Sequence, residues 1–252
     1  MHHLQHLHPH PRDSSITFEE EPHIYTIDGD DTFTSVTTWV HNNFQHFDAD
    51  KIISKMMRGK NWIVSKYFGL NREEIKAMWE KNRDEASTAG TKLHYDIECF
   101  YNNTEIHNDS KEYSYFLKFH EDFSHLTPYR TEWMVWDDEL KIAGSIDMLF
   151  TDNLGNLLIY DWKRSKEIKM TNKWQSSTNA IMSDVPDTNF WHYSLQLNIY
   201  KYLIEKNYSK TVSGLFLVIM HPNNKNKSYI RMEVPDLQDT IKLLAAQRLS
   251  EL

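Results

Sequence analysis

The feature that most constrains this chain is the stretch Lys141–Lys163, in which two apolar runs flank the polar segment Thr151–Asn156. The polar segment is rich in turn-forming residues, so the stretch predicts a β-hairpin. If the turn is centred on Leu154, residues whose numbers sum to 308 face each other. Asp147 then lies opposite Asp161 on the neighbouring strand (147 + 161 = 308).

Two carboxylates at opposing strand positions have Cβ atoms roughly 5 Å apart, and like charges at that spacing destabilise a sheet unless a cation lies between them. Mg²⁺ and Mn²⁺ are hard divalent ions that prefer carboxylate oxygens. Strand alternation also places Lys163 on the same face as Asp161. The hairpin therefore predicts a divalent metal site with a lysine beside it.

Such a site suits hydrolysis of a phosphodiester. A metal ion withdraws charge from the scissile phosphate and lowers the pKa of a bound water. Lys163 could orient or deprotonate that water and stabilise the developing negative charge. An Asp-x-Lys tripeptide is common by chance, so on its own it does not indicate an enzyme.

Composition sets the limits on other classes of protein. The 252 residues are 40% hydrophobic and 25% charged, which are the values of a globular chain with a full core. No apolar run approaches the ~18 residues of a membrane-spanning helix, so no membrane partner is expected. The single cysteine, Cys99, excludes a disulfide framework and a four-cysteine zinc or iron–sulfur site.

Charge is uneven along the chain. The net charge of −8 argues against a protein that coats nucleic acid through its overall field. Residues 51–66 nevertheless carry five cations and no acid, and residues 163–173 carry five cations and one acid. Such runs are more often solvated faces, but two of them could equally form local tracks for phosphate.

The first 15 residues are rich in histidine and low in complexity, which predicts a disordered tail that could chelate metal weakly. The tail has neither a secretory nor a transit pattern, so we expect an intracellular protein, in the cytoplasm, the nucleus or a phage-infected cell. Residues 16–252 are expected to form a single domain.

The order of predicted elements indicates an α/β protein (α+β layers) with one central mixed sheet flanked by helices and a helical N-terminal elaboration. Asp48 and Asn71 are expected to cap helices, the latter in a capping box with Glu74. The expected strands are 16–20, 23–27, 33–38, 131–136, the central hairpin, 213–220 and 228–234. The expected helices are 49–67, 71–85, one beginning near 90, 109–124, 191–207 and one that Asp236 caps. Residues 170–189 are expected to form a long loop.

Several polar residues on the predicted helices and strands need partners. Helical spacing places His94 and Glu98 on one face, where both could converge on one ion, although a lone histidine there is more often a core residue. Glu132 could equally point toward the metal or face solvent. In the helix 191–207, Gln196 and Tyr200 lie on a polar stripe that an active site would satisfy. Two tryptophans at the long loop, Trp174 and Trp191, are candidates for stacking on bases.

Four short motifs occur in a fixed order: Gly90–His94 (GTKLH), Gly144–Asp147 (GSID), Asp161–Lys163 (DWK) and Gln196–Tyr200 (QLNIY). With these motifs, over about residues 85–205, the chain resembles the PD-(D/E)xK nuclease superfamily, specifically its RecB-like exonuclease branch. The segments His23–Gly29 and Ser35–Thr38 are also similar to phage and mitochondrial genome-maintenance members of that branch.

The resemblance implies a restriction-endonuclease-like core that binds one or two Mg²⁺ or Mn²⁺ ions. Its expected ligands are Asp147, Asp161, the backbone carbonyl of Trp162 and His94, with Glu98 in the outer coordination sphere. Lys163 would be the catalytic lysine, while Gln196 and Tyr200 would brace the site or touch phosphate. The residues expected to contact nucleic acid are Thr91, Arg164, Lys166, Lys55, Arg58 and Lys60.

The chain departs from the family pattern in two ways. Ile146, in place of the frequent proline, precedes Asp147, which is a common RecB-like variant. With Cys99 alone, the chain cannot hold the iron–sulfur cluster of some relatives. No helicase motif is present, so any unwinding, replication or repair partner would be a separate chain.

The implied function is that of a metal-dependent deoxyribonuclease, an exonuclease on single-stranded or frayed DNA ends, in repair, recombination or replication. One alternative is an endonuclease on RNA or structured DNA with the same chemistry. Another is a catalytically silent module that binds nucleic acid or protein on a nuclease fold, against which the intact Asp147, Asp161 and Lys163 count.

Overall fold

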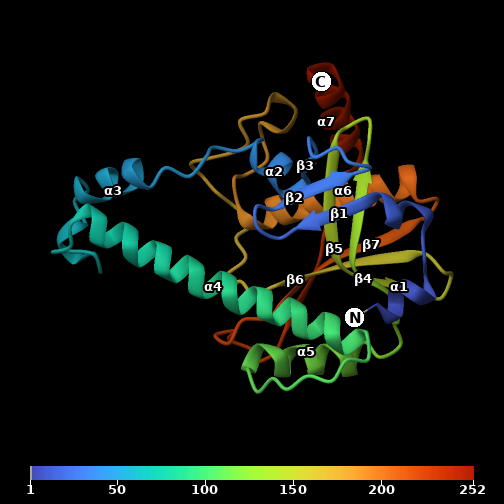
Figure 1. Ribbon diagram of the computed structural model, residues 1–252. Helices are drawn as coiled ribbons and strands as arrows, with labels where there is room; N and C mark the ends of the chain where they lie inside the picture. Colours follow the sequence, from blue (N-terminus) through green and yellow to red (C-terminus); the bar gives the residue numbers. More distant parts are fainter. Residues whose placement is uncertain (1) are drawn as a thin grey trace. The chain divides into compact units, whose positions relative to one another are not determined.

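The computed structural model describes residues 2–252, so residue 1 of the expected tail lies outside it (Figure 1). The chain divides into two compact units. The first, the sheet unit, comprises the residues up to Gln45 together with Leu93–Leu252, and the second, the helical unit, comprises His46–Lys92. This division differs from the single domain expected over residues 16–252, and each unit is described by itself.

Within the described residues, the main sheet of the sheet unit has six strands: β3 (Thr34–Ser35), β4 (Thr127–Asp137), β5 (Ile142–Thr151), β6 (Leu157–Lys163), β7 (Val212–Ile219) and β8 (Ile230–Glu233). Strands β4, β5 and β6 form an antiparallel meander, and β8 pairs antiparallel with β7. Strands β3 and β7 run parallel to their partners β5 and β6. The sheet is mixed, so the predicted fold class is confirmed.

The central hairpin has the predicted register. Met148 pairs with Tyr160 and Leu149 with Ile159, and both pairs sum to 308. Asp152 closes the turn by accepting hydrogen bonds from two later backbone N–H groups through its carboxylate. The turn composition, together with the alternation on both sides, was therefore sufficient to fix which residues face each other.

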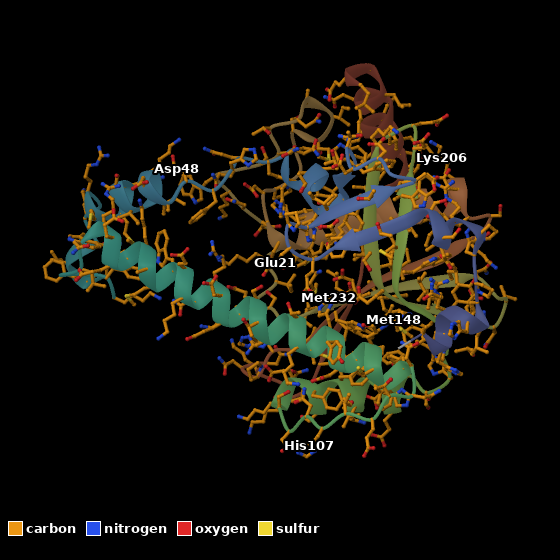
Figure 2. The ribbon with its side chains drawn as sticks, in the orientation of Figure 1. Glu21, Asp48, His107, Met148, Lys206 and Met232 are labelled. Carbon is orange, nitrogen blue, oxygen red and sulfur yellow. The ribbon has the colours of Figure 1, made fainter. Side chains whose placement is uncertain are left out.

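Helices cover both faces of the sheet (Figure 1). On one face α6 (Asn189–Asn207) packs with α2 (Val36–His41) and α7 (Gln238–Glu251) on a core that includes Ile159. On the other, α5 (Lys111–Asp122) and the last turns of α4 (Arg72–Tyr101) pack on a core that includes the fully buried Met148, labelled in Figure 2. Helix α6 connects the parallel strands β6 and β7, as a parallel pair requires.

The N-terminal segment is ordered, so the prediction of a disordered tail over residues 1–15 is wrong for its described residues. It forms α1 (His3–Leu7) and the 3-10 turn η1 (Pro11–Ser15). Leu4 is buried, and the Asp13 carboxylate accepts hydrogen bonds from Arg130 and from the indole of Trp133, each at 2.8 Å. A few anchoring residues set among histidines order the segment, which composition alone does not reveal.

The N-terminal hairpin is confirmed, but the strand expected at 33–38 is not. Strands β1 (Ile16–Glu19) and β2 (Ile24–Ile27) pair antiparallel. After the two residues of β3 the chain turns into α2, because the Ser35 hydroxyl accepts the N–H of Thr38 and caps the helix. The β-branched run that follows Ser35 favoured a strand, and the cap overrides that local preference.

The helical unit contains α3 (Ala49–Met57), the 3-10 turn η2 (Trp62–Val64) and the first part of α4. The expected caps are confirmed: Asp48 accepts the N–H of Lys51, and Asn71 and Glu74 bond each other's backbone N–H groups. Helix α3 ends at Met57, ten residues before the expected end.

Helix α4 runs without a break through Gly90, where a helix start or a tight helix–helix contact was expected. An added Cβ at Gly90 would meet nothing within 4 Å, so no close packing requires the glycine. A single glycine weakens a long helix without ending it.

The other expected helices and strands are present close to their predicted bounds. The expected loop 170–189 contains the short 3-10 turn η3 (Ala180–Met182) and ends at Asn189, where α6 begins. Among residues 2–252, no helix is both long enough and apolar enough to cross a membrane.

Candidate metal centre

Three carboxylate residues stand at corresponding positions on the three strands of the meander. The register of β4 and β5, given by Trp133 opposite Ile146, places Glu132 opposite Asp147 (both pairs sum to 279). The register of β5 and β6 places Asp147 in line with Asp161. We call Glu132, Asp147 and Asp161 the acid row.

At Asp147 the strands β5 and β6 diverge. Their last backbone pair is Met148 with Tyr160, and beyond it the Asp147 carboxylate accepts the backbone N–H of Trp162 at 2.8 Å. A side-chain oxygen has thus replaced the next backbone acceptor of the ladder. The divergence leaves the second carboxylate oxygen of Asp147 uncommitted to the sheet and available to a ligand.

His94, on α4, faces two members of the acid row. Its Nε2 lies 2.8 Å from the Trp162 carbonyl oxygen, and its Nδ1 lies 3.5 Å from Asp147 Oδ2 and 4.0 Å from Glu132 Oε1. We assign the proton to Nε2, since a carbonyl can only accept, and the lone pair of Nδ1 then points toward the carboxylates.

One ligand atom from each of His94, Glu132 and Asp147 lies within 4.8 Å of the other two, so the three could hold one ion. Carboxylates suit Mg²⁺, Ca²⁺ and Mn²⁺, and an imidazole suits Zn²⁺ and other transition metals, so this donor set fits several divalent ions. The Trp162 carbonyl, expected to be a ligand, instead accepts a hydrogen bond from His94 and fixes the orientation of the ring.

Asp161 is buried and pairs with Lys163 rather than with the His94 group. The lysine Nζ lies 2.7 Å from Asp161 Oδ2, as an ion pair without a well-directed hydrogen bond. Burial raises the pKa of Asp161 to about 6, a rise that Lys163 opposes and Asp147 reinforces. Burial acts to lower the pKa of Lys163, but Asp161 and Asp147 outweigh it and raise that pKa, so the ammonium is charged at neutral pH. In this arrangement Lys163 supplies a positive charge rather than a base.

The environment of Glu132 disfavours its ionised form. Burial, followed by repulsion from Asp147, raises the pKa of Glu132 to about 8, although the Ser145 hydroxyl donates a hydrogen bond to the carboxylate at 2.8 Å. The sequence left open whether Glu132 pointed toward the metal or toward solvent. The structure brings it to Asp147 and His94.

Tyr200 of α6 packs on β5 beside the acid row, and Gln196 holds its hydroxyl. The Gln196 amide donates a hydrogen bond to the Tyr200 hydroxyl at 3.3 Å. Tyr200 packs so closely on Gly144 that an added Cβ would lie 2.8 Å from Cε1 of its ring. Gly144 therefore has a steric role three residues before Asp147, since any larger side chain would displace the Tyr200 ring.

Tyr25 on β2 is a neighbour of the acid row that the sequence did not single out. It is buried, and burial, with the carboxylates of Glu132 and Asp147 nearby, raises the pKa of its hydroxyl. Its position in the chain lies more than a hundred residues before Glu132, and nothing in a short β-hairpin signals such a contact. Tyr193, which the sequence places on the same helical stripe as Gln196 and Tyr200, also lies nearby, with its ring centroid 4.6 Å from Lys163 Nζ.

The remaining expected residues do not join the acid row. Glu98 lines a separate cavity of ≈ 120 Å³ that Glu132 also borders, and burial raises its pKa. Arg164 is half-buried and pairs with Glu112 at 2.6 Å, whereas Lys166 is exposed. The others belong to the helical unit, where all are exposed: Lys55, Arg58, Lys60 and Thr91.

The sequence matches no protein-family model and no curated protein. Among solved structures, the chain is similar to one described as "Crystal structure of SSO0001", with a TM-score of 0.36 and 13% sequence identity. The match covers 88% of this chain and 77% of that chain. A likeness of this degree says nothing about function.

Proposed function

We propose that this chain is a metal-dependent nuclease that hydrolyses phosphodiester bonds, with DNA as its substrate. The observation that carries the proposal is the convergence of His94, Glu132 and Asp147, from three separate elements, next to a charged Lys163. Buried carboxylates that repel one another destabilise a fold unless a cation offsets them. Four buried or half-buried ionisable groups in one place indicate a functional site more often than a structural one.

The residues divide the work as follows. A bound Mg²⁺ or Mn²⁺ would draw charge from the phosphate and acidify a water. His94, Glu132 and Asp147 would hold that ion, with Asp161 at its margin. Lys163 would stabilise negative charge on the phosphate, and its ion pair with Asp161 keeps the ammonium in position. Tyr200, whose hydroxyl accepts a hydrogen bond from Gln196, packs on Gly144 of β5 and would help to position Asp147.

The substrate preference follows the family resemblance. We expect the protein to act in a cell and to cleave DNA from single-stranded or frayed ends. Closed circular DNA, which has no ends, should not be cleaved. The mixed sheet and the basic runs are compatible with this preference, and the substrate panel below decides it.

The test compares end-labelled linear single strands, duplexes, circles and RNA, in Mg²⁺, Mn²⁺ and EDTA. Wild type should shorten linear DNA only with a divalent metal, and Asp161→Asn should be inactive. Asp184→Asn, an exposed carboxylate of the long loop, serves as the matched control and should cleave normally. Calorimetric titration with Mn²⁺ should show binding to wild type and weaker binding to Glu132→Gln.

Three outcomes would change the proposal. Cleavage that persists in EDTA, or full activity of Asp161→Asn, contradicts it. Cleaved circles or RNA would keep the metal centre and change the class to an endonuclease. Mn²⁺ binding without cleavage of any substrate would leave a metal-binding protein of another kind.

A further inference from the structure

A second candidate site lies at the beginning of α6. It is a groove of ≈ 660 Å³, formed by the loop around Lys169–Trp174 and by the chain from Asp187 to His192. None of the expected catalytic or metal-binding residues lines this groove. The groove is therefore separate from the candidate metal centre.

Thr188, at the base of the groove, has an unmet hydrogen-bonding capacity. It is the N-cap residue of α6, yet its side chain does not accept a helix N–H group. The residue is 7% exposed, and its Oγ1 is buried without a hydrogen-bond partner. A threonine at this position normally bonds the first turn. The first turn of a 19-residue helix therefore lacks its usual side-chain acceptor, and its dipole favours an anion there.

The charged groups around the groove also favour an anion. Lys169 and Lys173 line it and are both exposed. One carboxylate, that of Asp187, lines it too and lies 2.9 Å from His192 Nε2, but burial lowers the pKa of that imidazole, so the two lysines face one uncompensated negative charge. Lys169 lies 3.8 Å from Glu167 in an exposed pair, which holds it only weakly.

Trp174 stands on the rim of the groove with 91% of its surface exposed. Within residues 2–252 its ring makes no stacking or cation–π contact. Its loop is nevertheless fixed, because Asn172 accepts the N–H groups of Trp174 and Gln175 and donates to the Asp187 carbonyl. Sites for single-stranded nucleic acid present aromatic side chains in this way, because a base can stack on the free face of the ring.

The groove and the metal centre share one helix. Tyr193, whose ring lies against Lys163, is five residues beyond Thr188, which corresponds to ~7.5 Å along the helix axis. Strand β6, which ends at Lys163, leads within six residues to Lys169 in the groove. A polymer bound in the groove would therefore run close to the acid row.

We propose that this groove binds single-stranded nucleic acid beside the bond to be cut. Thr188 and the first turn of α6 take a phosphate, assisted by Lys169 and Lys173, and Trp174 stacks on a neighbouring base. A duplex does not offer an unstacked base to such a platform, whereas a single strand does. The proposal rests on the proposed nuclease function for its substrate, but it is tested by binding alone.

The test measures the anisotropy of a labelled oligothymidylate of about 12 nucleotides, within the usual range for such sites, on full-length protein in EDTA so that cleavage is absent. Trp174→Ala should weaken binding about tenfold, and Trp174→Phe should restore most of it. Lys173→Ala should reduce the slope of log affinity against log salt by about 0.7. Leu154→Ala and Lys225→Ala remove exposed side chains elsewhere in the sheet unit and should change nothing.

Unchanged affinity of Trp174→Ala, or equal losses on duplex and single strand, would overturn the proposal, as would no binding by wild type. Oligouridylate measured in parallel shows whether the strand is DNA or RNA, and a tenfold loss on either supports the single-strand site. The two proposals can fail separately. If Trp174→Ala weakens binding but wild type cleaves no substrate, the proposed binding groove is supported and the proposed nuclease function is contradicted. If Trp174→Ala binds normally and cleaves, the nuclease function is supported and the groove is contradicted.

Discussion

Buried charge takes two opposite forms within the sheet unit. In the acid row, Glu132 and Asp147 converge beside the imidazole of His94, and Asp161 pairs with Lys163, the one ammonium next to the three carboxylates. In two arginine pairs, each carboxylate has a guanidinium of its own: Asp13 lies 2.8 Å from Arg130 and Glu112 lies 2.6 Å from Arg164.

This difference in pairing distinguishes charged groups that stabilise the fold from charged groups that are arranged to bind a ligand. A paired and hydrogen-bonded charge can remain buried without a partner from outside, whereas a surplus of like charge raises the free energy of the folded state. Lys163 and Arg164 illustrate the division, since they are consecutive residues of equal charge on opposite faces of the chain. The first belongs to the acid row and the second to an arginine pair.

The largest expected effect is a difference between substitutions at the neighbouring residues Lys163 and Arg164. Lys163→Met should lower the cleavage rate about 10²–10³-fold at saturating metal, because the charge that stabilises the phosphate is lost. Arg164→Met should leave the rate nearly unchanged and lower the free energy of unfolding instead. Single-turnover cleavage rates measure the effect on activity, and urea unfolding measures the effect on stability. Equal losses of activity in both variants would contradict the division.

The next effect concerns the Asp13–Arg130 pair. Asp13→Ala leaves a buried guanidinium without its carboxylate, so the free energy of unfolding should fall by about 3 kcal/mol. His6→Ala, an exposed change in the same segment, is the matched control. If the two variants unfold at the same urea concentration, the N-terminal segment contributes nothing to the fold.

A smaller effect of opposite sign is expected in the acid row. Without divalent metal, and at a pH above the Glu132 pKa of about 8, Glu132→Gln should raise the free energy of unfolding by about 1 kcal/mol, because it removes one repelling charge and keeps the shape. Melting temperature should rise by about 2–4 °C. Glu105→Gln, an exposed glutamate, should have no effect. In Mn²⁺ the order should reverse, and a stabilising effect that survives Mn²⁺ would show that Glu132 does not contribute to the ion site.

The smallest effect is a dependence on pH. Burial alone would raise the pKa of Asp13, but the hydrogen bonds from Arg130 and Trp133 outweigh it and lower that pKa. A carboxyl with a lower pKa in the folded state stabilises the fold fully above its unfolded pKa of about 3.9, and the stabilisation is lost as pH falls through the folded value. Unfolding free energy should therefore fall more steeply below about pH 4 in wild type than in Asp13→Asn. If the free energy of unfolding falls equally with pH in wild type and Asp13→Asn, the Asp13–Arg130 pair is not the cause of the acid sensitivity.

The part of the site that could be predicted from sequence is the part that local chemistry decides. A turn-rich segment between two alternating runs sets the register of β5 and β6, and so places Asp147 and Asp161 directly beyond the last pair of the ladder, Met148 with Tyr160. Glu132 could not be assigned, because it has a φ of 42° that departs from strand geometry, and alternation no longer indicates which way its side chain points.

The rest depends on contacts between distant parts of the chain. Tyr25 reaches the acid row, and Arg130 orders the N-terminal segment, through packing that no window of sequence contains. Ser35 and Gly90 show that local sequence signals can also mislead. The serine ends a strand-like run by capping a helix, and the glycine fails to end a helix that its neighbours sustain.

The meander that carries the acid row has a consequence for how the protein folds. From Glu132 to Asp161 the chain runs only 29 residues (161 − 132), whereas pairing Asp161 with Leu217 on β7 must close 56 (217 − 161). Because short loops lose less entropy on closure, the meander is the portion of the sheet that forms most readily. The fold's most local contacts thus bring its like charges together. If the acid row binds a divalent cation, as proposed, that cation should increase the folding rate itself when it is present during refolding, and not only the stability of the product.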